Sequence, residues 1–234
     1  MTSNPLNDES YWDREWRDIF EHYQNDRRFA YYLRSVLTPE DERILELGAG
    51  SFRDMQQLNA WDIDCCGTDF SQTAVELAQD TYPQLRDKIL KANAFALPFA
   101  DGEFDLSYHN GFWVCFNDAD IHLLIKEQVR VSRRAIVAAV HNNHNEQFKA
   151  YFEKLKAESD LYSCRFFSLE QVHEFMGDYC RDVTVIPVGK GKKRYEDYLI
   201  NLGLGDANAL RACWVHHGMD LLEESERLLC IGTL

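Results

Sequence analysis

The sequence predicts an α/β fold in which a mostly parallel sheet is covered by helices on both faces. Between Arg43 and His141, short apolar runs alternate with longer amphipathic segments, as strands alternate with crossover helices. The first apolar run also ends in two spaced glycines, where a strand turns sharply into a helix. The 234 residues contain no internal repeat and no Gly/Ser/Pro-rich linker, so we expect a single domain over 1–234.

The apolar runs are expected to be the strands because they are short, rich in apolar residues and separated by turn residues or polar segments. In chain order they are Arg43–Leu47, Asp62–Thr68, Lys88–Ala92, Phe104–Tyr108, Arg134–His141, Val183–Val188 and Leu228–Gly232.

Helices are expected between and after these strands, where capping residues precede apolar periodicity. The expected helices are Ser51–Asn59, Ser71–Tyr82, Asp118–Ser132, Ser168–Asp178 and Asp206–His217. At the front, Ser10–Leu37 is dense in aromatic residues at helical spacing. It predicts two amphipathic helices, either packed on the sheet or forming a lid over a ligand through Tyr11, Trp12 and Trp16.

Composition narrows the classes of protein. With 25 Lys and Arg against 39 Asp and Glu, the net charge is −14, which disfavours nucleic acid and anionic membrane as partners. Met1–Glu9 lacks the features of a signal peptide, and the apolar runs are too short to span a membrane. The seven cysteines form no C-x-x-C pair, so we expect small buried hydrophobic residues in a cytoplasmic protein, with no metal site.

The glycine turn is the most informative segment. It places Glu46 two residues before Gly48 and Gly50, and Arg53 stands where a dinucleotide fingerprint requires a third glycine. A carboxylate beside a pyrophosphate is unfavourable, whereas it suits an ammonium group such as that of S-adenosylmethionine.

Two further segments fit an adenosine. Asp69 ends the second expected strand, where an acid can accept both ribose hydroxyls. Asn93, Ala94 and Phe95 follow the third strand, where a small amide and a flat ring can read an adenine edge.

The ordered set E-L-G-A-G, G-T-D, N-A-F and L-P-F-A-D-G-E-F-D resembles the class I (Rossmann-like) S-adenosylmethionine-dependent methyltransferases, closest to their small-molecule branch. The resemblance covers Arg43–His141. It implies a seven-stranded sheet, mostly parallel with an antiparallel C-terminal hairpin, and S-adenosylmethionine as cofactor. It further implies a helical lid in 1–40, a cofactor-binding half in 41–145, and substrate-side helices with the final strands in 146–234.

The resemblance also implies the residues of the cofactor site. Glu46, Gly48 and Gly50 would line the methionine end, Asp69 would take the ribose and Phe70 would flank the adenine. The complete expected set is Tyr11, Trp16, Glu46, Gly48, Ala49, Gly50, Asp69, Phe70, Asn93, Ala94, Phe95 and His109.

Two departures from the family pattern stand out. Phe52 replaces the usual third glycine, which we expect to narrow the turn and reposition the methionine part of the cofactor. Val131–Arg134 replaces a Pro-Gly-Gly turn, which predicts an altered helix-to-strand connection away from the site.

Three histidines are the candidate catalytic residues, because they follow the fourth and fifth expected strands and titrate near neutrality. We expect His141 or His144 to bind or deprotonate the substrate, with His109 nearer the cofactor. The alternative is that these residues only cap strand ends and helix starts.

The expected acceptor is a small organic molecule. No Asp/Asn-Pro-Pro-aromatic tetrad follows the fourth strand, so methylation of DNA bases is not expected. Aromatic residues after the fourth and fifth strands, together with the N-terminal segment, predict a partly apolar pocket closed by a lid. The alternatives are a non-catalytic cofactor-binding protein, or a protein or RNA methyltransferase that docks its partner through Lys190–Arg194. A monomer and a homodimer remain equally open.

Overall fold

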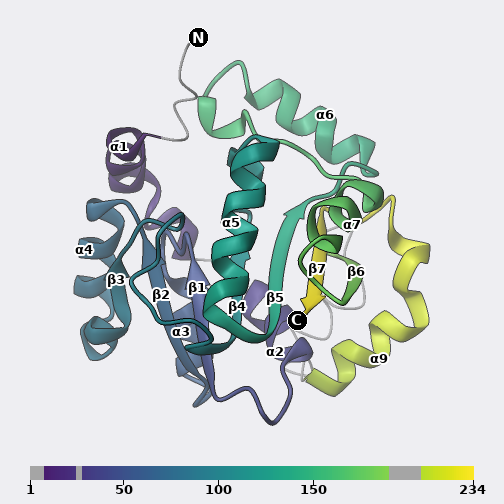
Figure 1. The fold of residues 1–234 in the computed structure, drawn as a ribbon. Coiled ribbons are helices and arrows are strands. Elements are labelled where there is room, and N and C mark those ends of the chain that lie inside the picture. Colours follow the sequence, from purple (N-terminus) through teal and green to yellow (C-terminus); the bar gives the residue numbers. More distant parts are fainter. Residues whose placement is uncertain (1–7, 25–27, 190–206) are drawn as a thin grey trace.

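The computed structural model describes residues 8–24, 28–189 and 207–234 (Figure 1). The basic run Lys190–Arg194 lies outside the described residues, so its predicted role as a solvated loop or docking site is not addressed by the structure.

The sheet has seven strands in the order β3-β2-β1-β4-β5-β7-β6. The first five pair in parallel, and β7 pairs antiparallel with both β5 and β6. The predicted fold class is therefore confirmed. The strands are β1 Arg43–Leu47, β2 Asp64–Asp69, β3 Ile89–Lys91, β4 Phe104–Asn110, β5 Ser132–His141, β6 Asp182–Val188 and β7 Arg227–Thr233.

Helices cover both faces of this sheet, which explains why its strands are apolar on both sides (Figure 1). One hydrophobic core lies between the sheet and α1 to α4 with α9, and the second lies under α5 and α7. The α-helices are α1 Glu9–Ile19, α2 Arg28–Val36, α3 Arg53–Asn59, α4 Gln72–Thr81, α5 Asp118–Val131, α6 Glu146–Leu155, α7 Leu169–Gly177 and α9 Ala207–His217. Short 3-10 helices are η2 His22–Gln24, η3 Pro83–Lys88, η4 Trp113–Cys115, η5 Asp160–Tyr162 and η6 Gly218–Leu221.

Local capping sets the helix starts as the sequence predicts. Ser71 Oγ accepts from the backbone N–H of Ala74 at 3.1 Å, and Ser168 forms a capping box with Gln171. The second strand begins at Asp64 rather than Asp62, because Asp62 adopts a left-handed φ of 61° that interrupts an extended chain.

The connection from α5 to β5 is altered, as expected from the missing Pro-Gly-Gly turn. Helix α5 ends at Val131 and β5 begins at the next residue, Ser132. The hydroxyl of Ser132 donates to the carbonyl of Gln128 at 2.8 Å and lies 2.6 Å from the Ser107 hydroxyl. This junction lies at the amino end of β5, whereas ligands in open α/β sheets bind at the carboxyl ends.

Candidate functional site

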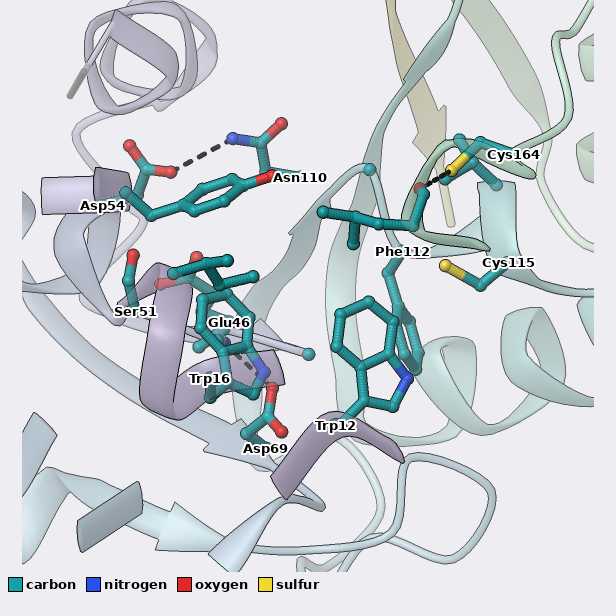
Figure 2. Close-up of a pocket in the computed structure, with 18 of the residues that line it drawn as sticks. Trp12, Trp16, Glu46, Ser51, Asp54, Asp69, Asn110, Phe112, Cys115 and Cys164 are labelled. Atoms are coloured by element: carbon teal, nitrogen blue, oxygen red, sulfur yellow. Dashed lines mark hydrogen bonds between the residues drawn. The ribbon is translucent and has the colours of Figure 1, made fainter. Parts of the chain in front are cut away.

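Two adjoining spaces open at the carboxyl ends of the central strands, beneath helix α1 (Figure 2). The inner cavity, of about 200 Å³, is walled by Trp16, Gly50, Asn110, His141 and Arg227 among others. The outer hollow, of about 540 Å³, is walled by Phe70, Asn93, Ala94 and Phe95 among others. Gly48, Asp69, Phe70, Phe112 and Phe116 border both spaces, so the two form one continuous site.

The glycine turn requires glycine at both positions. Gly48 and Gly50 have φ values of +56° and +55°, in the left-handed region that L side chains rarely adopt. A Cβ on Gly50 would lie 2.2 Å from Trp16 Cζ2, and one on Gly48 would lie 2.6 Å from Phe112 Cδ2. Aromatic rings therefore lie directly against the turn, and any side chain there would displace them.

Phe52 takes the place of the third glycine without entering the site. It has a left-handed φ of 54°, is fully buried, and borders neither the inner cavity nor the outer hollow. Its ring packs on Gly67 of β2, where a Cβ would lie 2.6 Å from Phe52 Cδ1. The ring thus fills space below the turn, on the side away from a ligand.

Two buried acids lie beneath the turn. Glu46 accepts from the backbone N–H of Met55 at 3.0 Å, and Asp54 accepts from the side-chain amide of Asn110 at 3.2 Å (Figure 2). Burial, and then the nearby Asp54 charge, raise the pKa of Glu46 well above its ordinary value, against hydrogen bonds from Tyr108 and Met55. Because both acids border the inner cavity, this end of the site favours a cation.

Asp69 stands where the inner cavity meets the outer hollow. Its Oδ2 accepts from the backbone N–H of Gly50 and its Oδ1 from that of Ser71, both at 2.9 Å. Burial raises its pKa to about 6, with these hydrogen bonds opposing the shift. Each carboxylate oxygen keeps a further lone pair, so the group can still accept hydrogen bonds from a vicinal diol.

The residues expected at the adenine edge border the outer hollow together. Asn93 Oδ1 accepts from the backbone N–H of Phe95 at 2.9 Å, which fixes the turn after β3. Ala94 is buried and Phe95 is exposed, so the hollow has a small floor and a flat aromatic wall.

Helix α1 closes the site from above. Trp12 and Trp16 point from it into the inner cavity (Figure 2). Asp13 fastens the helix to the start of α4, accepting from Ser71 Oγ at 2.6 Å and from the N–H of Thr73 at 3.0 Å. Tyr11, which the sequence placed at the cofactor, borders neither space, and burial raises its pKa to about 12.

The three predicted histidines separate in space. His141 borders the inner cavity, and burial, followed by the charge of Arg227, lowers its pKa well below the ordinary value. His109 is buried on the face of β4 opposite to the one that carries Asn110 at the inner cavity. Burial lowers the pKa of His109 to about 3, and its Nδ1 accepts from the backbone N–H of Phe112. His144 borders neither space, and its Nε2 accepts from the N–H of Leu169 at the start of α7.

His109 and His144 do not border the inner cavity, and the ring of each accepts a hydrogen bond from a backbone N–H elsewhere. The roles predicted for them remain predictions, with His141 the best placed of the three. Asn110 and Arg227 are among the cavity residues that were absent from the predicted set. Asn110 follows His109 on the opposite face, and Arg227 opens β7. The one sequence signal for Arg227 is a lone basic residue before an apolar run.

The cysteines divide into two groups. Cys65, Cys66 and Cys230 are free and buried as small hydrophobic residues, as predicted. Cys115, Cys164, Cys180 and Cys213 are only partly buried, so the prediction of fully buried cysteines was wrong for these four. Of them, Cys115 and Cys164 border the inner cavity (Figure 2).

Comparison with known proteins identifies the domain. Residues 45–138, which include the glycine turn, Asp69 and Asn93–Phe95, match the family model described as a methyltransferase domain. Residues 45–138 therefore match a methyltransferase domain, and the seven-stranded sheet that contains them has the class I, Rossmann-like methyltransferase fold. The resemblance drawn from the sequence motifs is thereby confirmed.

Several proteins resemble this methyltransferase domain. An O-methyltransferase of Aspergillus nomiae, rstn1, is 31% identical over 103 residues, which are 42% of this chain and 46% of that protein. The match therefore spans about half the length of that relative.

Solved structures share the fold over almost the whole chain. A possible histamine N-methyltransferase from Thermotoga maritima has a TM-score of 0.63 at 21% identity, covering 95% of this chain and 97% of its own. An S-adenosylmethionine-dependent methyltransferase from Archaeoglobus fulgidus has a TM-score of 0.65 at 13% identity, with the same coverage. Among the helices that the structure describes, none is long and apolar enough to cross a membrane.

Proposed function

We propose that this chain binds S-adenosylmethionine and transfers its methyl group to a small organic molecule. The observation that carries the proposal is the two-part site. The inner cavity lies under α1 against the glycine turn and its buried acids, and the outer hollow adjoins it with an aromatic wall. The matched methyltransferase domain and the relative named as an O-methyltransferase support the same reaction.

The residues present suit the cofactor at each of its parts. Glu46 and Asp54 offer negative charge to the methionine ammonium group, and Gly48 and Gly50 leave room for close backbone approach. Asp69 accepts the ribose hydroxyls at the junction of the two spaces. The adenine then lies in the outer hollow, whose wall contains Phe70 and the segment Asn93–Phe95.

The cofactor supplies an activated methyl group, and the protein's part is mainly alignment and water exclusion. Holding an acceptor in line can lower the barrier by roughly 7–11 kcal/mol. Trp12 and Trp16 exclude water from above, while Asn110 offers an amide to the acceptor at the end of β4. Burial, followed by the charge of Arg227, lowers the pKa of His141 and so favours its neutral form, in which a ring nitrogen can accept a hydrogen bond or a proton from a hydroxyl, amine or acidic carbon.

His109 has a different proposed role. It accepts from the N–H of Phe112, whose ring lies against Gly48, so it positions the turn between β4 and η4. We therefore treat His109 as a positioning residue and His141 as the candidate base. Replacing His141 by Ala, with unchanged turnover in a folded protein, would remove it from catalysis.

Calorimetry with S-adenosylmethionine and its demethylated product, S-adenosylhomocysteine, tests the proposal directly. We expect one site per chain for both, and transfer of a labelled methyl group to a member of a small-molecule library. Failure of both to bind at millimolar concentration would refute the proposed function.

A further inference from the structure

One nitrogen of an arginine in the inner cavity is buried without a hydrogen-bond partner. Arg227 opens β7, in register with His141 on β5. The residue as a whole keeps some exposed surface, but its Nη1 is buried and has no hydrogen-bond partner in the part of the chain that the structure describes. His141 Nδ1, on the neighbouring strand, is likewise buried and unpartnered.

The charges around Arg227 do not neutralise it. Among the described residues no carboxylate lies within ion-pair distance of its guanidinium, and Glu226 acts on it only through space. The other groups facing it are Tyr23, Cys164 and a second cation, Arg53, which itself lies 3.9 Å from Asp54. In a chain of net charge −14, this corner of the site keeps an excess positive charge.

A buried positive charge lowers the stability of the folded protein unless an anion pairs with it. Arginine stays protonated in proteins, so it cannot escape by losing its proton. Burying the Nη1 end of this cation without a partner is destabilising. The cost is removed when a bound molecule brings the missing anion into the cavity.

The position of Arg227 places that anion beside the methyl-acceptor end of the site. A Cβ built on Gly111 would lie 3.4 Å from Arg227 Nη1, so the guanidinium lies against the turn that follows Asn110. Its neighbours are apolar. The Phe148 ring lies 6.0 Å from the guanidinium carbon, and His141 is surrounded by the rings of Phe148, Phe152 and Phe166 at 5.5, 4.7 and 5.0 Å.

We propose that the inner cavity binds the carboxylate of a monoanionic organic acid on Arg227, with the acid's apolar part against Phe152 and Tyr162, and that such acids are the methyl acceptors. A carboxylate matches the planar fork of a guanidinium. A phosphate dianion fits less well, because Arg227 balances only one negative charge and the carboxyl groups of Glu46, Asp54 and Asp69 border the same cavity. The assignment of these acids as acceptors rests on the proposed function, whereas the anion subsite does not.

Matched pairs of ligands test the subsite. Benzoate, phenylacetate and 3-phenylpropionate are each compared with the corresponding primary amide, in protein saturated with S-adenosylhomocysteine, by calorimetry at pH 7.5. We expect at least one acid to bind about 10- to 100-fold more tightly than its amide, the range expected for hydrogen bonds to a charged group. Equal binding within every pair, or no binding of any acid, would overturn the proposal.

Variants assign the preference to Arg227. Arg227→Met should abolish the preference of acid over amide, and Arg227→Lys should retain part of it as a point charge. Arg165→Gln is the matched control, because Arg165 also stacks on a phenylalanine ring at 4.9 Å but pairs with Asp118 and lies outside the cavity. This control should leave the preference unchanged.

Stability gives a second readout that separates a ligand site from a structural one. Arg227→Met removes a buried, unpaired charge, so its melting temperature should equal or exceed that of the wild type. A large fall would mean that Arg227 is held by partners within the protein and would contradict the proposal.

The cofactor measurements keep the two hypotheses apart. Weaker binding of S-adenosylhomocysteine to Arg227→Met would show that Arg227 holds the cofactor's own carboxylate and would overturn the acid subsite. If the wild type bound the acids but no S-adenosyl compound, the proposed function would fail while the anion subsite stood.

Discussion

Replacing Asp69 by Asn should weaken cofactor binding and change the pH dependence of stability in a predictable way. The carboxylate is placed to accept the ribose hydroxyls, and hydrogen bonds to charged groups contribute about 1.5–3 kcal/mol. We therefore expect the dissociation constant for S-adenosylmethionine to rise about 10- to 100-fold at pH 7.5. Wild-type affinity should also fall below pH 6, as Asp69 becomes protonated, whereas the affinity of the variant should not.

The stability effect follows from the pKa of Asp69, which rises on folding from 3.8 to about 6. A raised pKa means that the folded state binds the proton more tightly, so the contribution of Asp69 to stability is full below pH 3.8 and is lost as the pH rises through 6. One pH unit below the folded-state pKa, at pH 5, the wild type should gain about 1.4 kcal/mol relative to Asp69→Asn, compared with pH 7.5.

Urea unfolding of both proteins at pH 5 and pH 7.5, with calorimetry at each pH, measures both effects. Asp64→Asn is the control, because Asp64 lies at the other end of β2 in a partly exposed ion pair with Lys88. It should leave cofactor affinity unchanged. A variant at Asp69 with wild-type affinity, or with no change in relative stability between the two pH values, would refute the assignment of Asp69.

Three further predictions concern the glycine turn, helix α1 and an ion pair at the amino ends of the central strands. Gly50→Ala should cost about 1–2 kcal/mol through its left-handed φ alone, and should weaken cofactor binding in calorimetry; retained affinity would argue against the turn as the binding element. Asp13→Ala should lower the free energy of unfolding by about 1–2 kcal/mol and speed proteolysis of α1. Its control, Glu9→Gln, removes an exposed ion pair and should lower that free energy by less than about 1 kcal/mol. Equal proteolysis rates for the two variants would mean that Asp13 does not fasten α1 to α4. Asp41→Ala leaves Arg134 unpaired and should lower the free energy of unfolding, measured in urea, by about 2–4 kcal/mol. Cofactor affinity should be unchanged, and a loss of affinity would contradict the separation of this ion pair from the cofactor site.

Strand positions were predictable to within about two residues because their signal is local. The run Arg43–Leu47 is a strand with the predicted ends, and Ser71 begins a helix through its own side chain. The chemistry of the cofactor half was predictable for the same reason, since Glu46, Gly48, Gly50 and Asp69 lie at strand ends whose partners follow closely in the chain.

The acceptor half was harder to predict because β4 and β5 are buried on both faces. Without alternation between apolar and polar residues, nothing in the sequence tells whether His109 or Asn110 faces the site. His144 was placed at the cavity from its position after β5, but the docking of Phe167 beside Asn142 directs it toward α7.

The sequence by itself determined the alternation of strands and helices, the glycine turn and the acids that flank it, because these depend on residues within one strand–turn–helix unit. Only the tertiary structure decided which side chains share the acceptor cavity. His141 and Arg227 meet because antiparallel pairing of β5 with β7 puts distant residues in register, and register is fixed by packing of the whole sheet rather than by local propensity.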